Sequence, residues 1–382
     1  MPKKSARNPV ASLAWSQALA WRVAQQHLRE RLPRKRMLDV VRDLCGVRAQ
    51  LSSSAELQLH ARLDGLARTD IADALAWERS LVRLWGVRGT LHLIRSDEFG
   101  LWTAALSTHR HFERPSWSKA FGVSQDELRQ LFDLVPQLLD GRALTRAELA
   151  DEVAARTGSA ALGETLRDSF GSVLKPLSLR GLLCFAPSDD QSPRLTSPKS
   201  WLPPWLQWEP EDALREVTRR YLRAYGPASR EEYARWWAGI SAAQAERRIE
   251  ALADEVAIVE VDGERRWLLA EDVDALVALE PRHVVRLLPA FDQYVVTAPR
   301  HPALVDPTLA PRIYRPQAYL SPTLLIDGRL VGVWRHERAG DRLAVTIEPF
   351  APLTSGDGRS AAREAERIAA FLGGALDLHG EL

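Results

Sequence analysis

The amino-acid sequence predicts a mainly α-helical protein with added β-structure, an α+β fold made of three tandem winged helix-turn-helix units and a C-terminal small β-barrel. Two observations predict this fold. A helix-opening signature occurs twice, and each copy is followed by a pattern typical of a β-hairpin. From about Val284 onward, the helical patterns give way to short β-rich runs separated by proline- and glycine-rich turns.

The repeated signature begins at Thr145 in TRAELADEVAART and at Ser229 in SREEYARWWAGIS. A glutamate follows three residues later in both copies, as in a capping box, where two side chains satisfy the free N–H groups at a helix start. Each copy is preceded by an amphipathic pattern (124–139 and 211–225) and followed by a further helical pattern (162–180 and 241–253). Both copies therefore predict a run of three helices.

Hairpin patterns follow these helices. The stretch VAIVEVDGERRWLLA alternates around Asp262-Gly263, a strong two-residue turn signal, and LLCFAP and RLTS flank a polar loop at 188–193. A weaker third copy has helices near 12–30, 36–45 and 53–66 and a hairpin at 81–95 that turns near Arg88-Gly89. Three helices followed by a hairpin indicate winged-helix units, which bind DNA. The alternative is a helical protein with incidental hairpins.

The C-terminal region has the β-rich runs RLLPAF, YVV, TLLIDGRLVGVW and LAVTIEPF, and then a helical pattern from near Ser360. It predicts a small barrel or sheet closed by a final helix. The predicted domains are 1–115 and 116–205, the first two winged-helix units; 206–282, the third; and 283–382, the barrel with its helix.

Composition limits the function classes. The net charge is +1, but only six lysines occur, so arginine supplies most of the 51 cations. Arginine suits phosphate and guanine edges, although the codon bias of a GC-rich genome would enrich it too. Basic clusters at 29–36 and 109–114 allow DNA binding through one face. Two cysteines exclude an iron–sulfur cluster and a structural zinc, and no dinucleotide or P-loop motif occurs, so we expect no metal and no cofactor. Without a membrane-length apolar run or a secretory signal, we expect a cytoplasmic protein.

Three stretches carry a resemblance to a known family: DVVRDLCGVRAQLSSSAELQLHARLDGL, LVRLWGVRGTLHLIRSDEF and LLPAFDQYVV…DGRLVGVWR. In this order, over about residues 15–372, the chain resembles the AlkZ/YcaQ family of winged-helix DNA glycosylases. The resemblance implies three winged-helix units and a β-barrel around a concave channel for damaged double-stranded DNA. It also implies excision of bulky N7-alkylated purines, including interstrand crosslinks, at the nucleoid, and we expect a monomer.

The family's Gln-x-Gln or Gln-x-Asp signature corresponds to Arg48-Ala49-Gln50, so the second polar residue is kept and the first is replaced. The resemblance implies that Gln50 positions the attacking water, assisted by Arg48 or His92. The alternative for Gln50 is a cap on the helix near Ser52, and for Arg48 a solvated cation at a helix end. Arg48 could also hold a phosphate beside the lesion.

Further residues are candidate DNA contacts or have structural alternatives. His92 would contact DNA or the abasic sugar, or be hydrogen-bonded in a core. Arg62 would bind a phosphate or form a buried ion pair. Asp292, considered as a catalytic acid, is more typical of a turn or an ion pair. The remaining candidate DNA-binding residues are Arg83, Arg88, Thr90, Arg300 and His301.

Two functions follow. One is a monofunctional DNA glycosylase for alkylated or crosslinked purines. The other is a non-catalytic DNA-binding protein, a lesion sensor or a transcriptional regulator, that uses the same basic face.

Overall fold

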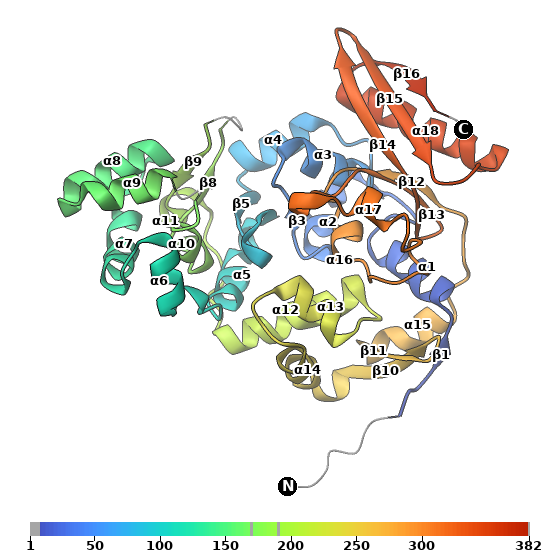
Figure 1. Cartoon of the computed structure of the whole chain (residues 1–382), viewed down its shortest axis with the longest axis horizontal. Helices are drawn as coiled ribbons and strands as arrows, with labels where there is room; N and C mark the ends of the chain where they lie inside the picture. Colours follow the sequence, from blue (N-terminus) through green and yellow to red (C-terminus); the bar gives the residue numbers. More distant parts are fainter. Residues whose placement is uncertain (1–7, 169–170, 189–191, 381–382) are drawn as a thin grey trace.

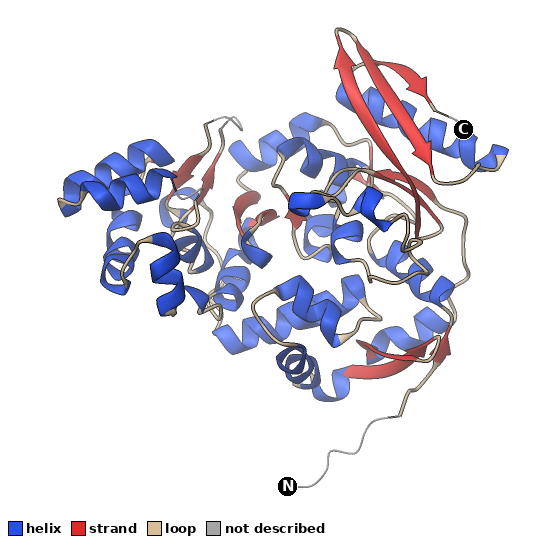
Figure 2. Ribbon diagram, viewed as in Figure 1, coloured by secondary structure: helices blue, strands red, loops and turns tan. Residues whose placement is uncertain are grey.

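The structure, a computed structural model, describes residues 8–168, 171–188 and 192–380. The second predicted unit lies at one end of the long axis and the C-terminal sheet lies toward the other, with the first unit between them (Figure 1). Helices dominate, and the longest strands belong to the C-terminal sheet (Figure 2). No helix among the described residues is long and apolar enough to span a bilayer.

The first region begins with a short strand, and it contains more helices than the three that the sequence predicted there. Its elements are β1 (Ser12–Leu13), α1 (Trp15–Gln25), β2 (Leu32–Pro33), α2 (Met37–Asp43), β3 (Val47–Arg48), α3 (Ser52–His60), β4 (Leu63–Asp64), α4 (Arg68–Ala76), β5 (Leu81–Trp85), β6 (Leu91–Arg95) and α5 (Phe99–Leu106). The hairpin predicted at 81–95 is present as β5 and β6. Helix α4 was not predicted; it begins where Asp70 accepts a hydrogen bond from the Ala67 backbone N–H.

The second and third regions contain the repeated signature. The second has α6 (Pro115–Phe121), α7 (Gln125–Leu138), β7 (Ala143–Thr145), α8 (Arg146–Thr157), α9 (Ala160–Asp168), α10 (Lys175–Leu179), β8 (Cys184–Ala186), β9 (Arg194–Thr196) and α11 (Pro198–Trp201). The third has α12 (Pro210–Tyr225), α13 (Arg230–Trp237), α14 (Ala242–Glu250), β10 (Val256–Val261), β11 (Glu264–Leu269) and α15 (Val273–Val277). The single helix predicted at 162–180 is divided into α9 and α10.

Both predicted capping boxes are confirmed. The Thr145 hydroxyl accepts from the Glu148 backbone N–H, and the Glu148 carboxylate accepts from the Thr145 N–H at 2.7 Å. Ser229 and Glu232 make the same two bonds at the start of α13. These local bonds fix where α8 and α13 begin, as the sequence indicated.

The same strand order recurs in the three regions. In each region, a short extended segment between two helices pairs with the last strand of the hairpin: β3 with β6, β7 with β9, and Ala228 with Trp267 of β11 through an isolated bridge. A single pair, Arg83 with Phe185, joins β5 to β8, so the first two hairpins form one six-stranded sheet, β3-β6-β5-β8-β9-β7. Strand β1 instead pairs with β10 of the third region. The regions therefore share sheets across the boundaries that the sequence suggested.

The C-terminal region is an open sheet covered by a long helix. Its elements are β12 (Val285–Leu288), α16 (Gln293–Thr297), α17 (Ala310–Ile313), β13 (Thr323–Ile326), β14 (Arg329–Ala339), β15 (Arg342–Pro349), α18 (Ser355–Leu372) and β16 (Ala375–His379). Among the described strands, β12 and β16 are the two edges of the sheet, so of the two predicted forms the region has the sheet with a final helix and not the barrel. Helix α18 begins earlier than predicted, because the Thr354 hydroxyl caps it by accepting from the Asp357 N–H.

The YVV run is a second correction. It was predicted to be β-structure, but it lies in the short helix α16. Asp292 caps this helix by accepting from the Tyr294 backbone N–H at 2.8 Å, and the side chain of Gln293 donates to the Gly46 carbonyl at 2.7 Å. These tertiary bonds override the local β-propensity.

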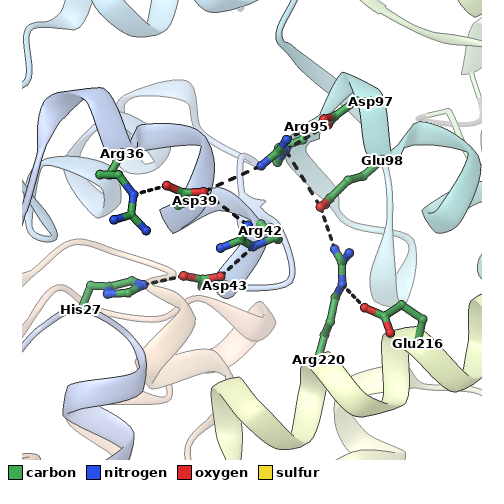
Figure 3. A network of polar contacts seen from close by, with 10 residues as sticks. All are labelled: His27, Arg36, Asp39, Arg42, Asp43, Arg95, Asp97, Glu98, Glu216 and Arg220. Atoms are coloured by element: carbon green, nitrogen blue, oxygen red, sulfur yellow. Dashed lines mark hydrogen bonds and ion pairs between the residues drawn. The ribbon is translucent and has the colours of Figure 1, made fainter. Parts of the chain in front are cut away.

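A chain of polar contacts holds the first region against α12 (Figure 3). Arg220 of α12 pairs with Glu98 at 2.9 Å, and Glu98 is within 4.0 Å of Arg95, which is in turn near Asp39 of α2. The same chain of contacts continues through Arg42 and Asp43 to His27, beyond the end of α1. It fixes α2, the hairpin and α12 relative to one another, and this arrangement positions the site described next.

Candidate nucleic-acid site

Gln50 follows β3 and lies at the surface. Helix α3 is capped at Leu51 without a side-chain hydrogen bond, so the alternative of Gln50 as a helix cap is not what the structure has. The Gln50 carboxamide oxygen instead faces the Leu91 backbone N–H of β6, at 3.5 Å. This long contact leaves the exposed carboxamide able to bind a further donor such as water.

Gln50 lines a hollow of about 680 Å³ between the first two regions, called here the Gln50 hollow. Arg83 and Trp85 of β5, Arg146 of α8 and Arg167 of α9 contribute to the same wall. The structure thus brings Gln50 and Arg83 together, as expected for two residues of one site. Arg83 also donates to the Ser52 hydroxyl at 3.2 Å and lies over the Phe185 ring.

Arg48 lies two residues before Gln50, in β3, and is half-buried. Its guanidinium lies 4.6 Å from the centre of the Phe291 ring, and its Nε is buried without a hydrogen-bond partner. Burial, with the nearby positive charge of Arg88, lowers the pKa of Arg48 to about 10. Arg48 is therefore a strand residue stacked on an aromatic ring, not the solvated helix-end cation that was one alternative.

Arg48 belongs to a group of four guanidiniums, the arginine cluster: Arg48, Arg88, Arg235 and Arg300. Arg88 is in the hairpin turn with a φ of 61°, and its pKa is lowered by burial and by the charges of Arg235 and Arg300. Arg235 of α13 donates to the Ala298 carbonyl at 3.2 Å, and Arg300 lies over the Tyr314 ring. Within the described part of the chain, none of the four has a carboxylate within 4.0 Å. An unneutralised group of this kind attracts anions.

His92 is buried, with only 3% of its surface exposed. Its Nδ1 is 2.9 Å from the Thr90 carbonyl, and the ring is not part of the wall of the Gln50 hollow. Burial, together with the charges of Arg88 and Arg48, lowers the pKa of His92 to about 3, so the ring is neutral at physiological pH. This position agrees with the alternative in which His92 is hydrogen-bonded in a core. Thr90 closes the same turn by donating its hydroxyl proton to the Val87 carbonyl at 3.0 Å.

Arg62 does not reach a DNA surface, because it is completely buried. Its guanidinium makes a bidentate ion pair with Asp292, both bonds 2.8 Å, and donates to the carbonyls of Gln26 and Gln58. The alternative of a buried ion pair is confirmed for Arg62 and for Asp292, and the proposed phosphate contact of Arg62 is wrong. Each of the three nitrogens of this guanidinium donates at least one hydrogen bond inside the protein.

His301 is also separated from Gln50. Its ring stacks on Trp15 at 4.3 Å between centroids, its Nε2 is 3.7 Å from a Glu264 carboxylate oxygen, and its Nδ1 accepts from the Ala303 N–H. These contacts place it against α1 and β11, whereas Arg300 beside it belongs to the arginine cluster. The sequence did not identify Phe291, Arg146, Arg167 or Arg235 as site residues, because only the tertiary fold brings them near Gln50 or Arg48.

Comparisons with known proteins identify the family of this chain. Residues 41–371 match the family model described as "DNA glycosylase AlkZ-like". A curated protein of Streptomyces sahachiroi, named interstrand DNA cross-link repair glycosylase, is 36% identical over 351 residues, which cover 88% of this chain and 91% of that protein. The solved structure of Streptomyces sahachiroi DNA glycosylase AlkZ superposes with a TM-score of 0.87 at 33% identity, covering 96% of this chain and all of that one. The chain belongs to the AlkZ-like family of DNA glycosylases.

Proposed function

We propose that this protein is a monofunctional DNA glycosylase that hydrolyses the N-glycosidic bond of bulky N7-alkylated purines or interstrand crosslinks in double-stranded DNA. Membership of the family supports the reaction class. The observation that carries the assignment for this chain is the exposed Gln50 carboxamide, held by the Leu91 N–H at the rim of a large hollow.

This hydrolysis requires few catalytic groups from the protein. Alkylation at N7 makes the base a cationic leaving group, so the enzyme must stabilise an oxocarbenium-like transition state and position one water at the anomeric carbon. A carboxamide oxygen can accept from that water and face the developing cation. Gln50 takes this role in our proposal.

We assign Arg48 to phosphate binding. A fixed positive charge opposes a cationic transition state. Stacking over Phe291 holds the Arg48 guanidinium within the arginine cluster, which can bind the DNA backbone beside the lesion. His92 would then support the hairpin from within.

Room for a bulky adduct lies on both sides of Leu51. This exposed side chain lines the Gln50 hollow and also a second hollow of about 550 Å³ bounded by α3 and the C-terminal sheet. The substrate would accordingly be a bulky lesion, held without tight enclosure of the base.

We further infer that the three regions are winged-helix units, because in each a segment between two helices pairs with the last strand of the hairpin. The units correspond to 1–115, 116–205 and 206–282, with β1 contributed to the third. Three DNA-binding units in one chain favour action as a monomer, and the substrate would place the protein at the nucleoid.

The test is excision by the wild-type protein. Duplexes with N7-methylguanine, or with a nitrogen-mustard crosslink, are incubated with the protein and then cleaved in alkali at abasic sites. We expect abasic product from the damaged strand only. Salt-sensitive binding without abasic product would overturn the proposal and favour the second candidate, a non-catalytic lesion sensor or regulator, for which the replacement of the first signature residue by Arg48 is the supporting observation.

A further inference from the structure

A further hollow, of about 360 Å³, lies at the tip of the β5–β6 hairpin, and we call it the tip hollow. Arg88 and Gly89 of the hairpin turn form one wall, and Lys175 of α10 forms another. The hollow is also lined by His109 and His111, which follow α5, by Ser172, and by Gly239, which follows α13. All three regions with the repeated strand order thus contribute to it.

The charged side chains of the tip hollow are both cations, Arg88 and Lys175, and the other polar side chains are His109, His111 and Ser172. Burial lowers the pKa of His109 to about 4 and also lowers the pKa of His111, so the imidazoles act here as neutral polar groups. No aspartate or glutamate from the described part of the chain lines the tip hollow. The ammonium group of half-buried Lys175 has no hydrogen bond or ion pair within that part of the chain, and burial lowers its pKa. Burying an ammonium group without a partner costs free energy, so an anion bound here would relieve that cost.

Gly89 and Gly239 lie next to two of the polar side chains of the tip hollow. A Cβ added to Gly89 would lie 3.5 Å from the Lys175 Cδ, and one added to Gly239 would lie 3.5 Å from the His109 Nδ1. His109 is held in place by stacking on Trp237, with 4.9 Å between ring centroids and 14° between planes. The lysine, the arginine fork and the imidazoles together form a concave set of donors, which suits a tetrahedral oxyanion.

We propose that the tip hollow binds a backbone phosphate of the DNA strand that passes the arginine cluster. This inference rests on the proposed function, because it takes DNA as the ligand. Arg88 connects the two places: it lines the tip hollow, and its charge acts on Arg48, two residues from Gln50. A phosphodiester held by Arg88 and Lys175 would fix the register of the strand beside the catalytic site.

The first experiment compares Lys175→Gln with the matched control Lys199→Gln, at an exposed position of α11. Affinities for a lesion-bearing and an undamaged duplex are measured by fluorescence anisotropy at a series of salt concentrations. We expect Lys175→Gln to weaken binding roughly tenfold at low salt and to reduce the slope of log K against log salt by about 0.9 on both duplexes. Lys199→Gln should change neither. An unchanged slope for folded Lys175→Gln would overturn the proposal; Lys175→Met, which suits a half-buried position, serves if the glutamine variant does not fold.

The second experiment locates the phosphate. Phosphodiesters of the duplex are replaced one at a time by neutral methylphosphonates. One replacement should weaken binding of the wild-type protein without further weakening Lys175→Gln, and additive losses at every position would contradict a direct contact.

A third measurement separates the two sources of a phosphate group. The thermal stability of the wild-type protein and of Lys175→Gln is measured with and without inorganic phosphate. If phosphate stabilises only the wild type, and the salt slope of DNA binding is the same for both proteins, the tip hollow binds a free phosphate and the DNA assignment is overturned. If Lys175→Gln changes the salt slope of DNA binding but the wild-type protein excises no base, the phosphate site is supported and only the proposed glycosylase activity is rejected.

Discussion

Arg62 and Asp292 form a bidentate ion pair although they are 230 residues apart, and neither side chain is exposed to solvent. The pair joins the segment directly after α3 of the first region to the start of α16 in the C-terminal region. The guanidinium of Arg48 lies over the ring of Phe291, the residue directly before Asp292. The buried pair therefore positions the aromatic ring on which one member of the arginine cluster lies.

Arg62→Met should destabilise the protein by about 3–5 kcal/mol, because it leaves the Asp292 carboxylate buried without its counter-charge. Denaturant unfolding measures this loss. Arg129→Met, which removes an exposed pair with Asp126 on α7, is the matched control and should change the free energy of unfolding by about 0.5 kcal/mol or less. Equal effects of the two substitutions would contradict the account of the buried pair.

Acid should destabilise the protein through its buried histidines. His60 stacks on Phe371, its ring nitrogens have no hydrogen-bond partner in the described structure, and burial with the charges of Arg367 and Arg31 lowers its pKa to about 4. Since the unfolded value is near 6.5, this contribution to stability is complete above that pH and is lost as the pH falls toward 4.

His60→Phe keeps a stacking ring and removes the titration. It should reduce the slope of unfolding free energy against pH between pH 6 and 4.5 by up to roughly 1.4 kcal/mol per pH unit, with the remaining slope due to groups such as His92. An identical slope in the variant would show that His60 does not titrate in this way.

The arginine cluster should govern the salt dependence of DNA binding. Arg235→Gln removes one of its charges and should lower the slope of log K against log salt by about 0.9. Arg359→Gln, at an exposed position of α18 outside the cluster, is the charge-matched control. If both substitutions lower the salt slope by the same amount, the arginine cluster contributes no more to DNA binding than an arginine outside it.

Arg48→Gln separates phosphate binding from catalysis. We expect weaker DNA binding, together with an excision rate constant at saturating protein that is equal to or higher than that of the wild type, because a charge that opposes the cationic transition state is removed. Single-turnover excision and anisotropy measure the two effects. A severalfold lower rate constant with unchanged affinity would make Arg48 a catalytic residue instead.

Features set by neighbouring residues could be predicted from the sequence. The caps at Thr145 and Ser229, the turn at Asp262-Gly263 and the hairpin around Arg88-Gly89 each depend on a few adjacent residues, and all are present. The signature around Gln50 was located by its resemblance to the family, and Arg83 of the hairpin was a candidate DNA contact. Both side chains line the Gln50 hollow.

Features set by distant residues could not be predicted. YVV forms a helix because Asp292 caps it and pairs with Arg62, far away in the sequence. The predicted barrel is open because closure depends on the pairing of β12 and β16, which no local pattern reveals. The arginine cluster likewise gathers side chains from β3, the hairpin turn, α13 and the segment after α16.

The most direct test of the proposed catalytic role is the single-turnover excision rate constant of Gln50→Ala on an N7-methylguanine duplex, measured beside the wild type and with the dissociation constant of each protein for the same duplex. We expect the rate constant to fall about 10²–10³-fold while the dissociation constant changes less than about threefold, since Gln50 acts on the water and the transition state. A Gln50→Ala rate constant equal to that of the wild type would contradict the account.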